Sequence, residues 1–129
     1  MATYRKLIAV VDDDASIRTA LCRQMRAAGY SAMPFSSAEE FLAVARSCGA
    51  AGIISDIHLG TLSGLQLAVH PLVLELKLPV VLVSGSSDPT VTGQAQEIAA
   101  IFLQKPIPPG KLLEAVIDTM GSPILELAD

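Results

Sequence analysis

Short runs of apolar residues recur along this chain, and helical patterns fill the stretches between them. The runs cover residues 7–11, 31–35, 52–54, 80–83 and 101–103. Most of them are continuously apolar rather than alternately apolar and polar, which is typical of strands buried on both faces. Because single helices separate these strands, the pattern predicts an α/β protein with a doubly wound, five-stranded parallel sheet and helices on both faces.

The first two helices have clear sequence patterns. Ile17, Leu21 and Met25 recur at four-residue spacing and predict the apolar face of one helix. Ser37 and Glu40 have the spacing of a capping box and predict the start of a second.

The later helices are less regular. Pro71 interrupts the third helical pattern and predicts a kink or an early break, since an interior proline costs a helix about 3 kcal/mol. A fourth helix should open at residues 88–89 and be short or mobile. Residues 108–109, both proline, suit the first turn of the last helix, and Gly121 ends it.

Length and charge limit the classes of function. The 129 residues suit one domain, expected over residues 1–121, followed by a tail over 122–129 with no obvious partner. A formal net charge of -4, from 9 basic and 13 acidic side chains, predicts no direct binding to nucleic acid or to an anionic membrane. We identify no signal peptide and no membrane span, so a cytoplasmic protein is expected.

The cysteines and histidines do not form a recognisable metal or redox motif. Cys22 and Cys48 lie far apart in sequence and within predicted helices, so buried free thiols are expected. His58 and His70 share no helical face with each other or with a cysteine, which argues against a structural zinc site.

Polar side chains follow four of the predicted strands. Asp12 and Asp13 follow the first strand, Asp56 ends the third, Ser84 the fourth and Lys105 the fifth. In an open parallel sheet, ligands bind beyond the carboxyl ends of the strands. We therefore expect these side chains to converge in one crevice. Clustered carboxylates repel one another unless a cation offsets them, so the pattern favours a divalent metal.

Each of these residues also has an ordinary structural interpretation. Asp14 fits a helix cap, Asp56 a strand-to-turn residue, and Ser84 an acceptor for a local backbone donor, while Lys105 before Pro106 could point to water. Joint occurrence at one sheet edge favours a functional site, because a separate explanation would otherwise be needed at every strand.

These motifs resemble the receiver domain of bacterial two-component response regulators. The resemblance covers nearly the whole chain and is carried by four motifs: VVDDD at 10–14, ISD at 54–56 with SG at 63–64, VSG at 83–85, and FLQKP at 102–106. The segments at 28–30 and 35–42 look most like FixJ- and NarL-type receivers. The family implies a flavodoxin-like strand order of 2-1-3-4-5.

The resemblance also implies roles for the polar residues. Asp56 would accept a phosphoryl group from a histidine kinase, and Lys105 would balance the charge that develops. Asp13, Asp56 and the backbone carbonyl of His58 would bind Mg²⁺, and Asp12 would hold a metal-bound water. The domain would be a signalling phosphoacceptor rather than a conventional enzyme.

Three further residues complete the implied site. The Ser84 hydroxyl would contact the phosphoryl group, and Phe102 would turn inward behind it as part of a conformational switch. Plain core packing explains Phe102 equally well. Pro106 would follow a cis peptide bond that directs Lys105 inward.

The sequence departs from the family pattern at several positions. Gly60 stands where proline is usual, Ser84 replaces the commoner threonine, and Pro71 interrupts a helix. The segment 97–101 lacks the usual small Gly-Ala turn. We expect phosphoryl acceptance to persist despite these changes.

Two other classes of function compete with the receiver interpretation. A haloacid dehalogenase-type phosphohydrolase would use Asp12 and Asp14 but leaves Asp56 without a role. A pseudo-receiver would bind a partner without phosphorylation, although Asp56 and Lys105 are both present. A flavin carrier is set aside, because carboxylates after the first strand would repel its phosphate.

The expected partners are a sensor histidine kinase or phosphotransfer protein and an output protein. Acting as a stand-alone domain, the chain would signal through its surface, by dimerising, or by draining phosphoryl groups from a kinase. The apolar stretch at 72–78 suggests more exposed apolar surface than one domain needs, which would suit a homodimer. Burial in the core explains the stretch equally well.

Overall fold

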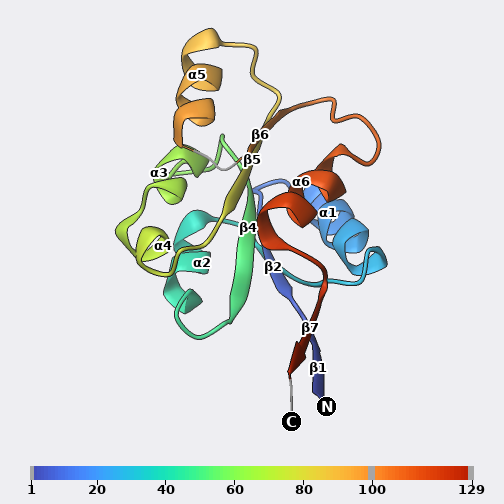
Figure 1. Cartoon of the computed structure of the whole chain (residues 1–129). Helices are drawn as coiled ribbons and strands as arrows, with labels where there is room; N and C mark the ends of the chain where they lie inside the picture. The colour runs from blue at the N-terminus through green and yellow to red at the C-terminus, as the bar shows by residue number, and fades with distance from the viewer. Residues whose placement is uncertain (1, 99–100, 128–129) are drawn as a thin grey trace.

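A parallel sheet of five strands forms the centre of the protein (Figure 1). The computed structural model describes residues 2–98 and 101–127. The strands are β2 (Leu7–Val11), β3 (Ser31–Phe35), β4 (Ala50–Asp56), β5 (Val80–Ser84) and β6 (Ile101–Gln104), in the order β3-β2-β4-β5-β6. Counted along the chain, this is the expected 2-1-3-4-5 order, and it brings the ends of β2 and β4 side by side.

Helices cover both faces of the sheet, as the continuously apolar strands predict. On one face lie α1 (Ala15–Ala27) and α6 (Lys111–Met120). On the other lie α2 (Ala38–Val44), α3 (Gly64–Ala68), α4 (Pro71–Glu75) and α5 (Pro89–Ile98) (Figure 1). Each face has its own buried apolar cluster, and alternate residues of one strand enter different clusters: Ala9 and Val11 face α2, whereas Ile8 and Val10 face α1.

The break expected at Pro71 is confirmed. Pro71 is the first residue of α4, where its missing N–H is not needed, and the His70 side chain caps this helix by accepting from Leu72 N at 3.1 Å. The helix expected to open at residues 88–89 is α5, which begins at Pro89. It has ten residues and is longer than α2, α3 and α4, so it is not the short helix expected. The unusual segment before β6 includes Ala99 and Ala100, which lie outside the described residues.

The start expected for the last helix is wrong. The helix α6 begins at Lys111, after both prolines, and its N-cap Gly110 has φ 82°. Lys111 N donates to Pro108 O at 3.1 Å. Proline followed by glycine at positive φ is the preferred centre of a type II turn, so Pro109 and Gly110 form a turn instead. Gly121 does end α6, as expected.

The capping box predicted for α2 is only half formed. Ser37 Oγ accepts from Glu40 N at 3.1 Å, but Glu40 Oε2 accepts from Ser36 N at 3.3 Å instead of from the Ser37 amide.

The tail expected to have no partner instead forms a strand. Within it, β7 (Ile124–Leu127) pairs antiparallel with β1 (Ala2–Arg5), and this two-stranded ribbon projects from the body with both termini at its tip (Figure 1). Segments of four residues, separated by the whole domain, carry too little periodicity to be paired from sequence.

Buried and half-buried polar groups fasten this ribbon to the body. Lys6 Nζ donates to Met120 O at 3.0 Å, and Tyr30 Oη donates to Gly121 O at 2.5 Å. Lys6 N also donates to Pro123 O at 2.8 Å. Tyr30 is almost completely buried, and this burial raises the pKa of its phenol. We refer to Lys6, Tyr30 and their carbonyl partners as the terminal latch.

The apolar stretch at 72–78 belongs mostly to the core. Val73 is buried, and Leu72, Leu76 and Leu78 pack against the cluster on the α2 face. Only Leu74 of these leucines is strongly exposed, at 60%. The stretch therefore gives little support to a homodimer.

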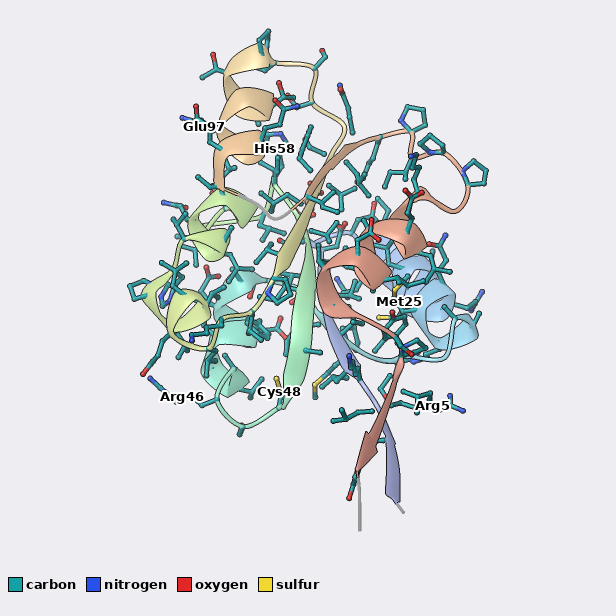
Figure 2. The ribbon with its side chains drawn as sticks, viewed as in Figure 1. Arg5, Met25, Arg46, Cys48, His58 and Glu97 are labelled. Atoms are coloured by element: carbon teal, nitrogen blue, oxygen red, sulfur yellow. The ribbon has the colours of Figure 1, made fainter. Side chains whose placement is uncertain are left out.

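The two thiols differ in burial. Cys22 on α1 is buried, as expected. The expectation of a buried thiol within a helix is wrong for Cys48, which is half-buried and lies beyond the end of α2, near the start of β4 (Figure 2). Both are free. In the described part of the chain, no helix is long and apolar enough to cross a membrane.

Candidate functional site

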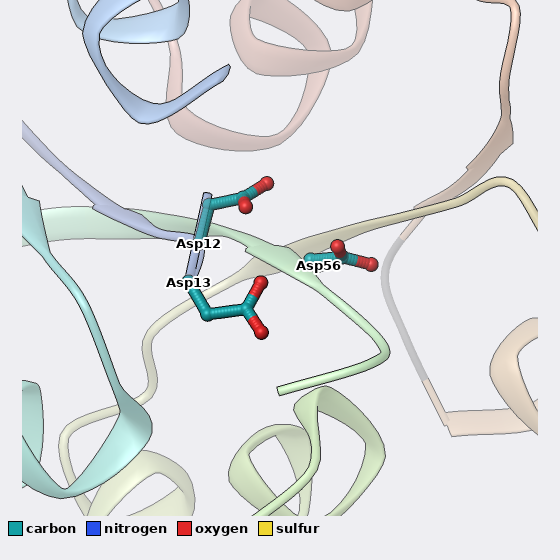
Figure 3. A group of neighbouring side chains, drawn as sticks. All are labelled: Asp12, Asp13 and Asp56. Carbon is teal, nitrogen blue, oxygen red and sulfur yellow. The ribbon is translucent and has the colours of Figure 1, made fainter. Parts of the chain in front are cut away.

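Three carboxylates converge at the carboxyl edge of the sheet. Asp12 and Asp13 follow β2, and Asp56 ends the neighbouring strand β4 (Figure 3). Val11 and Ser55 are register partners, so the two strands leave the sheet at the same level. One oxygen from each carboxylate lies within 4.8 Å of the others. The convergence expected from the sequence is present for these three residues.

Asp12 is the most buried member of this cluster, with 2% of its surface exposed. Its Oδ1 accepts from Asp14 N at 2.9 Å. Burial raises the pKa of Asp12, and the negative charges of Asp56 and Asp13 raise it further, while the Asp14 amide and Lys105 act in the opposite direction. Ionised Asp12 is thus incompletely balanced by the protein's own groups.

Asp14 belongs to the helix rather than to the cluster. Its Oδ1 accepts from Ser16 N at 2.9 Å and from Ile17 N at 3.2 Å, which makes it the N-cap of α1. The ordinary interpretation of Asp14 as a helix cap is confirmed.

Lys105 reaches the cluster from the end of β6. Its Nζ lies 3.9 Å from Asp56 Oδ2, a loose ion pair, and its backbone N donates to Ser84 O at 2.8 Å. The bond between Lys105 and Pro106 is cis, as the resemblance implies. One ammonium group therefore faces three carboxylates.

Ser84 and Phe102 have the ordinary structural roles that the sequence allowed. Ser84 is fully buried at the end of β5, and its Oγ accepts from Ser86 N at 3.0 Å. Among the described residues its hydroxyl donates no hydrogen bond. Phe102 is half-buried and packs against the cluster on the α2 face.

The loop after Asp56 is held close to the carboxylates. His58 N donates to Asp56 Oδ1 at 3.2 Å, and Gly64 N donates to Ile57 O at 2.9 Å. A Cβ at Gly64 would lie 2.2 Å from Asp56 O, so only glycine fits there. At Gly60, by contrast, a Cβ would meet nothing within 4 Å. The His58 side chain is exposed.

The donor set fits a hard divalent cation. Its ligands are carboxylate oxygens from two strands, in reach of one another and short of positive charge. A cation bound there would relieve the repulsion that raises the pKa of Asp12. Asp12, Asp13 and Asp56 are thus compatible with Mg²⁺.

One polar contact near the site was not predicted from the sequence. Gln104, which directly precedes Lys105, donates from Nε2 to Ser86 O at 3.0 Å. Its position at the end of β6 was the available signal, but sequence cannot say which loop a strand-end amide will reach.

The fold and the site together define a class of α/β domain that gathers carboxylates and a lysine at the carboxyl edge of a parallel sheet. The chain belongs to the response regulator receiver domain family, whose pattern matches residues 8–117.

Individual relatives agree with this assignment. Nodulation protein W of Bradyrhizobium diazoefficiens is 31% identical over 117 residues, which cover 90% of this chain and 52% of the relative. The transcriptional regulatory protein FixJ of Rhizobium meliloti is 26% identical over 108 residues, 83% of this chain and 53% of the relative. The chain thus spans about half the length of these relatives, and the expected likeness to FixJ-type receivers is confirmed.

Solved structures agree as well. A response regulator receiver protein from Pseudomonas putida superposes with a TM-score of 0.79 at 30% identity, over 89% of this chain and 98% of that one.

Proposed function

We propose that this chain accepts a phosphoryl group on Asp56 from the phosphohistidine of a sensor histidine kinase or phosphotransfer protein. The observation that carries the proposal is the convergence of Asp12, Asp13 and Asp56 within 4.8 Å, with Lys105 Nζ 3.9 Å from Asp56. Asp56 belongs to both groups, which suits a nucleophile between a metal and a cationic side chain.

The reaction exchanges one bond to phosphorus for another. A carboxylate oxygen of Asp56 forms a bond to phosphorus as the P–N bond to the histidine breaks. The electron pair of that bond stays on the imidazole nitrogen. The other ring nitrogen keeps its proton, so the released histidine is neutral. Later attack of water on phosphorus would release inorganic phosphate and regenerate the carboxylate.

The other residues of the site would bind the metal ion and the phosphoryl group. Asp13, Asp56 and the His58 carbonyl would hold Mg²⁺, and Asp12 would hold one of its waters. Mg²⁺ held by these residues would offset the negative charge of the nucleophile and of the transferring group. Lys105 would contact a phosphoryl oxygen opposite the carboxylates, and the Ser84 hydroxyl would donate to another. Phe102 would then turn inward in the accompanying switch.

The signalling role follows from this chemistry. The chain would act as a phosphoacceptor rather than as a conventional enzyme, in the cytoplasm, and would signal through phosphorylation-dependent contact with an output protein. Dimerisation of the phosphorylated chain, or the draining of phosphoryl groups from a kinase, would be other consequences of the same phosphorylation. FixJ is named a transcriptional regulatory protein, and this chain matches only about half of its length.

The competing phosphohydrolase has less support. It needs Asp14 beside Asp12 as a free catalytic carboxylate, but Asp14 Oδ1 already accepts two hydrogen bonds from the start of α1.

Intact mass after incubation with acetyl phosphate, with and without Mg²⁺, tests the proposal. We expect one phosphoryl adduct in the parent, dependent on Mg²⁺ and absent in Asp56→Asn. Asp118→Asn, the same change on the exposed face of α6, should retain the adduct. An adduct that persists in Asp56→Asn would favour another acceptor. No adduct in the parent would favour a pseudo-receiver.

A further inference from the structure

The loop between β5 and α5 is held from two sides at one residue. Ser86 N donates to Ser84 Oγ at 3.0 Å, and Ser86 O accepts from Gln104 Nε2 at 3.0 Å. The orientation of the Gln104 amide is unambiguous, because only its NH₂ group can face a carbonyl oxygen. The backbone of Ser86 is thereby connected to the Ser84 hydroxyl on one side and to β6 on the other.

The geometry of β6 explains why Gln104 reaches this loop. Ser84 and Gln104 are register partners in neighbouring parallel strands, so their side chains leave the same face of the sheet. Phe102, two residues earlier, also lies on this face and packs against its cluster. Because phenylalanine has no hydrogen-bonding group, it cannot make a polar contact with the loop. Gln104 supplies that contact.

We propose that Gln104 is a positioning residue that holds the Ser84–Ser86 segment in its unphosphorylated arrangement and so opposes the phosphorylated one. This inference rests on the proposed function, in which the Ser84 hydroxyl donates to the phosphoryl group. When Ser84 and the attached Ser86 amide are drawn toward Asp56, the Ser86 carbonyl leaves Gln104. A hydrogen bond made in only one of two states biases the equilibrium toward that state.

The size of the bias follows from the strength of one exposed hydrogen bond. Such bonds contribute about 0.5–1.5 kcal/mol, which corresponds to roughly a two- to twelvefold change in an equilibrium constant. The contact therefore adjusts the balance between the two arrangements without locking either.

The test removes the donor and keeps the length of the side chain. Gln104→Met lacks the amide, and Gln24→Met makes the same change on the exposed face of α1 as the matched control. Two quantities are measured in the full chain. The first is the hydrogen-exchange rate of the Ser86 amide without metal or phosphoryl donor. The second is the affinity for beryllofluoride, a phosphoryl mimic, with Mg²⁺.

In Gln104→Met we expect Ser86 to exchange about three- to tenfold faster and beryllofluoride to bind about three- to tenfold tighter, with Gln24→Met unchanged in both. Unchanged exchange in Gln104→Met would show that the contact does not hold the loop. Faster exchange with unchanged or weaker affinity would show that it does not oppose the phosphorylated arrangement. Either result overturns the inference.

Failure of the proposed function has a different readout. A parent chain that takes up neither beryllofluoride nor a phosphoryl group from acetyl phosphate rejects the phosphoacceptor mechanism itself. The regulatory role of Gln104 falls with it, even if Ser86 exchange responds to the substitution.

Discussion

The two edges of the central sheet differ in how their polar and charged groups are paired. At the amino edge, the terminal latch pairs the Lys6 ammonium and the Tyr30 hydroxyl directly with the carbonyls of Met120 and Gly121. At the carboxyl edge, three carboxylates lie within 4.8 Å of one another, and the Lys105 ammonium lies 3.9 Å from one of them, Asp56. The hydrogen bonds of the amino edge are formed within the described chain, whereas at the carboxyl edge Lys105, together with the Arg18 guanidinium that donates to Asp12 O at 2.7 Å, faces a larger number of carboxylates.

This difference separates stability from function. Groups whose hydrogen bonds are satisfied inside the protein stabilise the fold, and removing one leaves a buried partner unpaired. Like charges held together without full compensation destabilise the free protein but create a site for a cation. Removing a latch hydrogen bond and removing a clustered carboxylate should therefore change stability in opposite directions.

The largest effect is expected at Gly64, where the carboxyl edge depends on backbone packing. In Gly64→Ala the new Cβ would lie 2.2 Å from Asp56 O, and the loop must move. We expect the free energy of unfolding to fall by about 3 kcal/mol, the upper range for overpacking. Urea denaturation measures this, and phosphoryl acceptance should fall too. Gly60→Ala is the matched control, since its Cβ meets nothing within 4 Å; equal losses in both variants would contradict the explanation.

Tyr30→Phe tests whether the amino edge contributes only stability. The substitution removes a buried hydroxyl and leaves Gly121 O without that donor. The free energy of unfolding should fall by about 1–2 kcal/mol, while Mg²⁺-dependent phosphoryl acceptance in the folded protein is unchanged. Tyr4→Phe, at a side chain that is 56% exposed, is the control. A changed phosphoryl lifetime in Tyr30→Phe would break the proposed separation of the two edges.

Asp12→Asn should have the opposite sign. We expect the metal-free variant to be more stable than the parent at pH 7 by roughly 0.5–2 kcal/mol, a usual gain from relieving an unfavourable charge. It should also bind Mg²⁺ more weakly. Denaturation with and without Mg²⁺ measures both, and Asp118→Asn controls for the loss of one surface charge.

The pH dependence of this effect has a definite sign. Because the pKa of Asp12 is raised in the folded state, its contribution to stability is fully present below the unfolded pKa of about 3.8 and is lost as the pH rises through the folded pKa. The advantage of Asp12→Asn over the metal-free parent should therefore grow with pH across this range. An advantage that shrinks as the pH rises would be inconsistent with the raised pKa.

The smallest effect is expected at Lys77, where the chain turns from α4 into β5 at the amino edge. Lys77 has φ 55°, and the amides of Lys77 and Leu78 donate to the carbonyls of Leu74 and Val73, which is a Schellman motif. Glycine suits this conformation better than lysine. Lys77→Gly should raise the melting temperature slightly, equivalent to about 0.5–1 kcal/mol. Lys111→Gly, inside the first turn of α6, should be destabilising.

Local patterns in the sequence determined the main elements and the membership of the site. The five core strands and the break at Pro71 follow from apolar runs and proline chemistry, whose causes lie within a few neighbouring residues. Asp12, Asp13 and Asp56 could be placed at one edge because parallel strands end there. The type II turn before α6 was also readable from Pro109 and Gly110, but the prediction gave too much weight to proline at a helix start.

Only the tertiary structure decided the long-range contacts. The pairing of β1 with β7, the terminal latch and the contact of Gln104 with Ser86 join segments that lie far apart in sequence. The burial of most apolar side chains in the stretch at 72–78, whose one strongly exposed leucine is Leu74, is likewise set by which helix faces the sheet. No local pattern encodes such contacts, because they depend on the relative positions that the whole sheet imposes on its strand ends and helices.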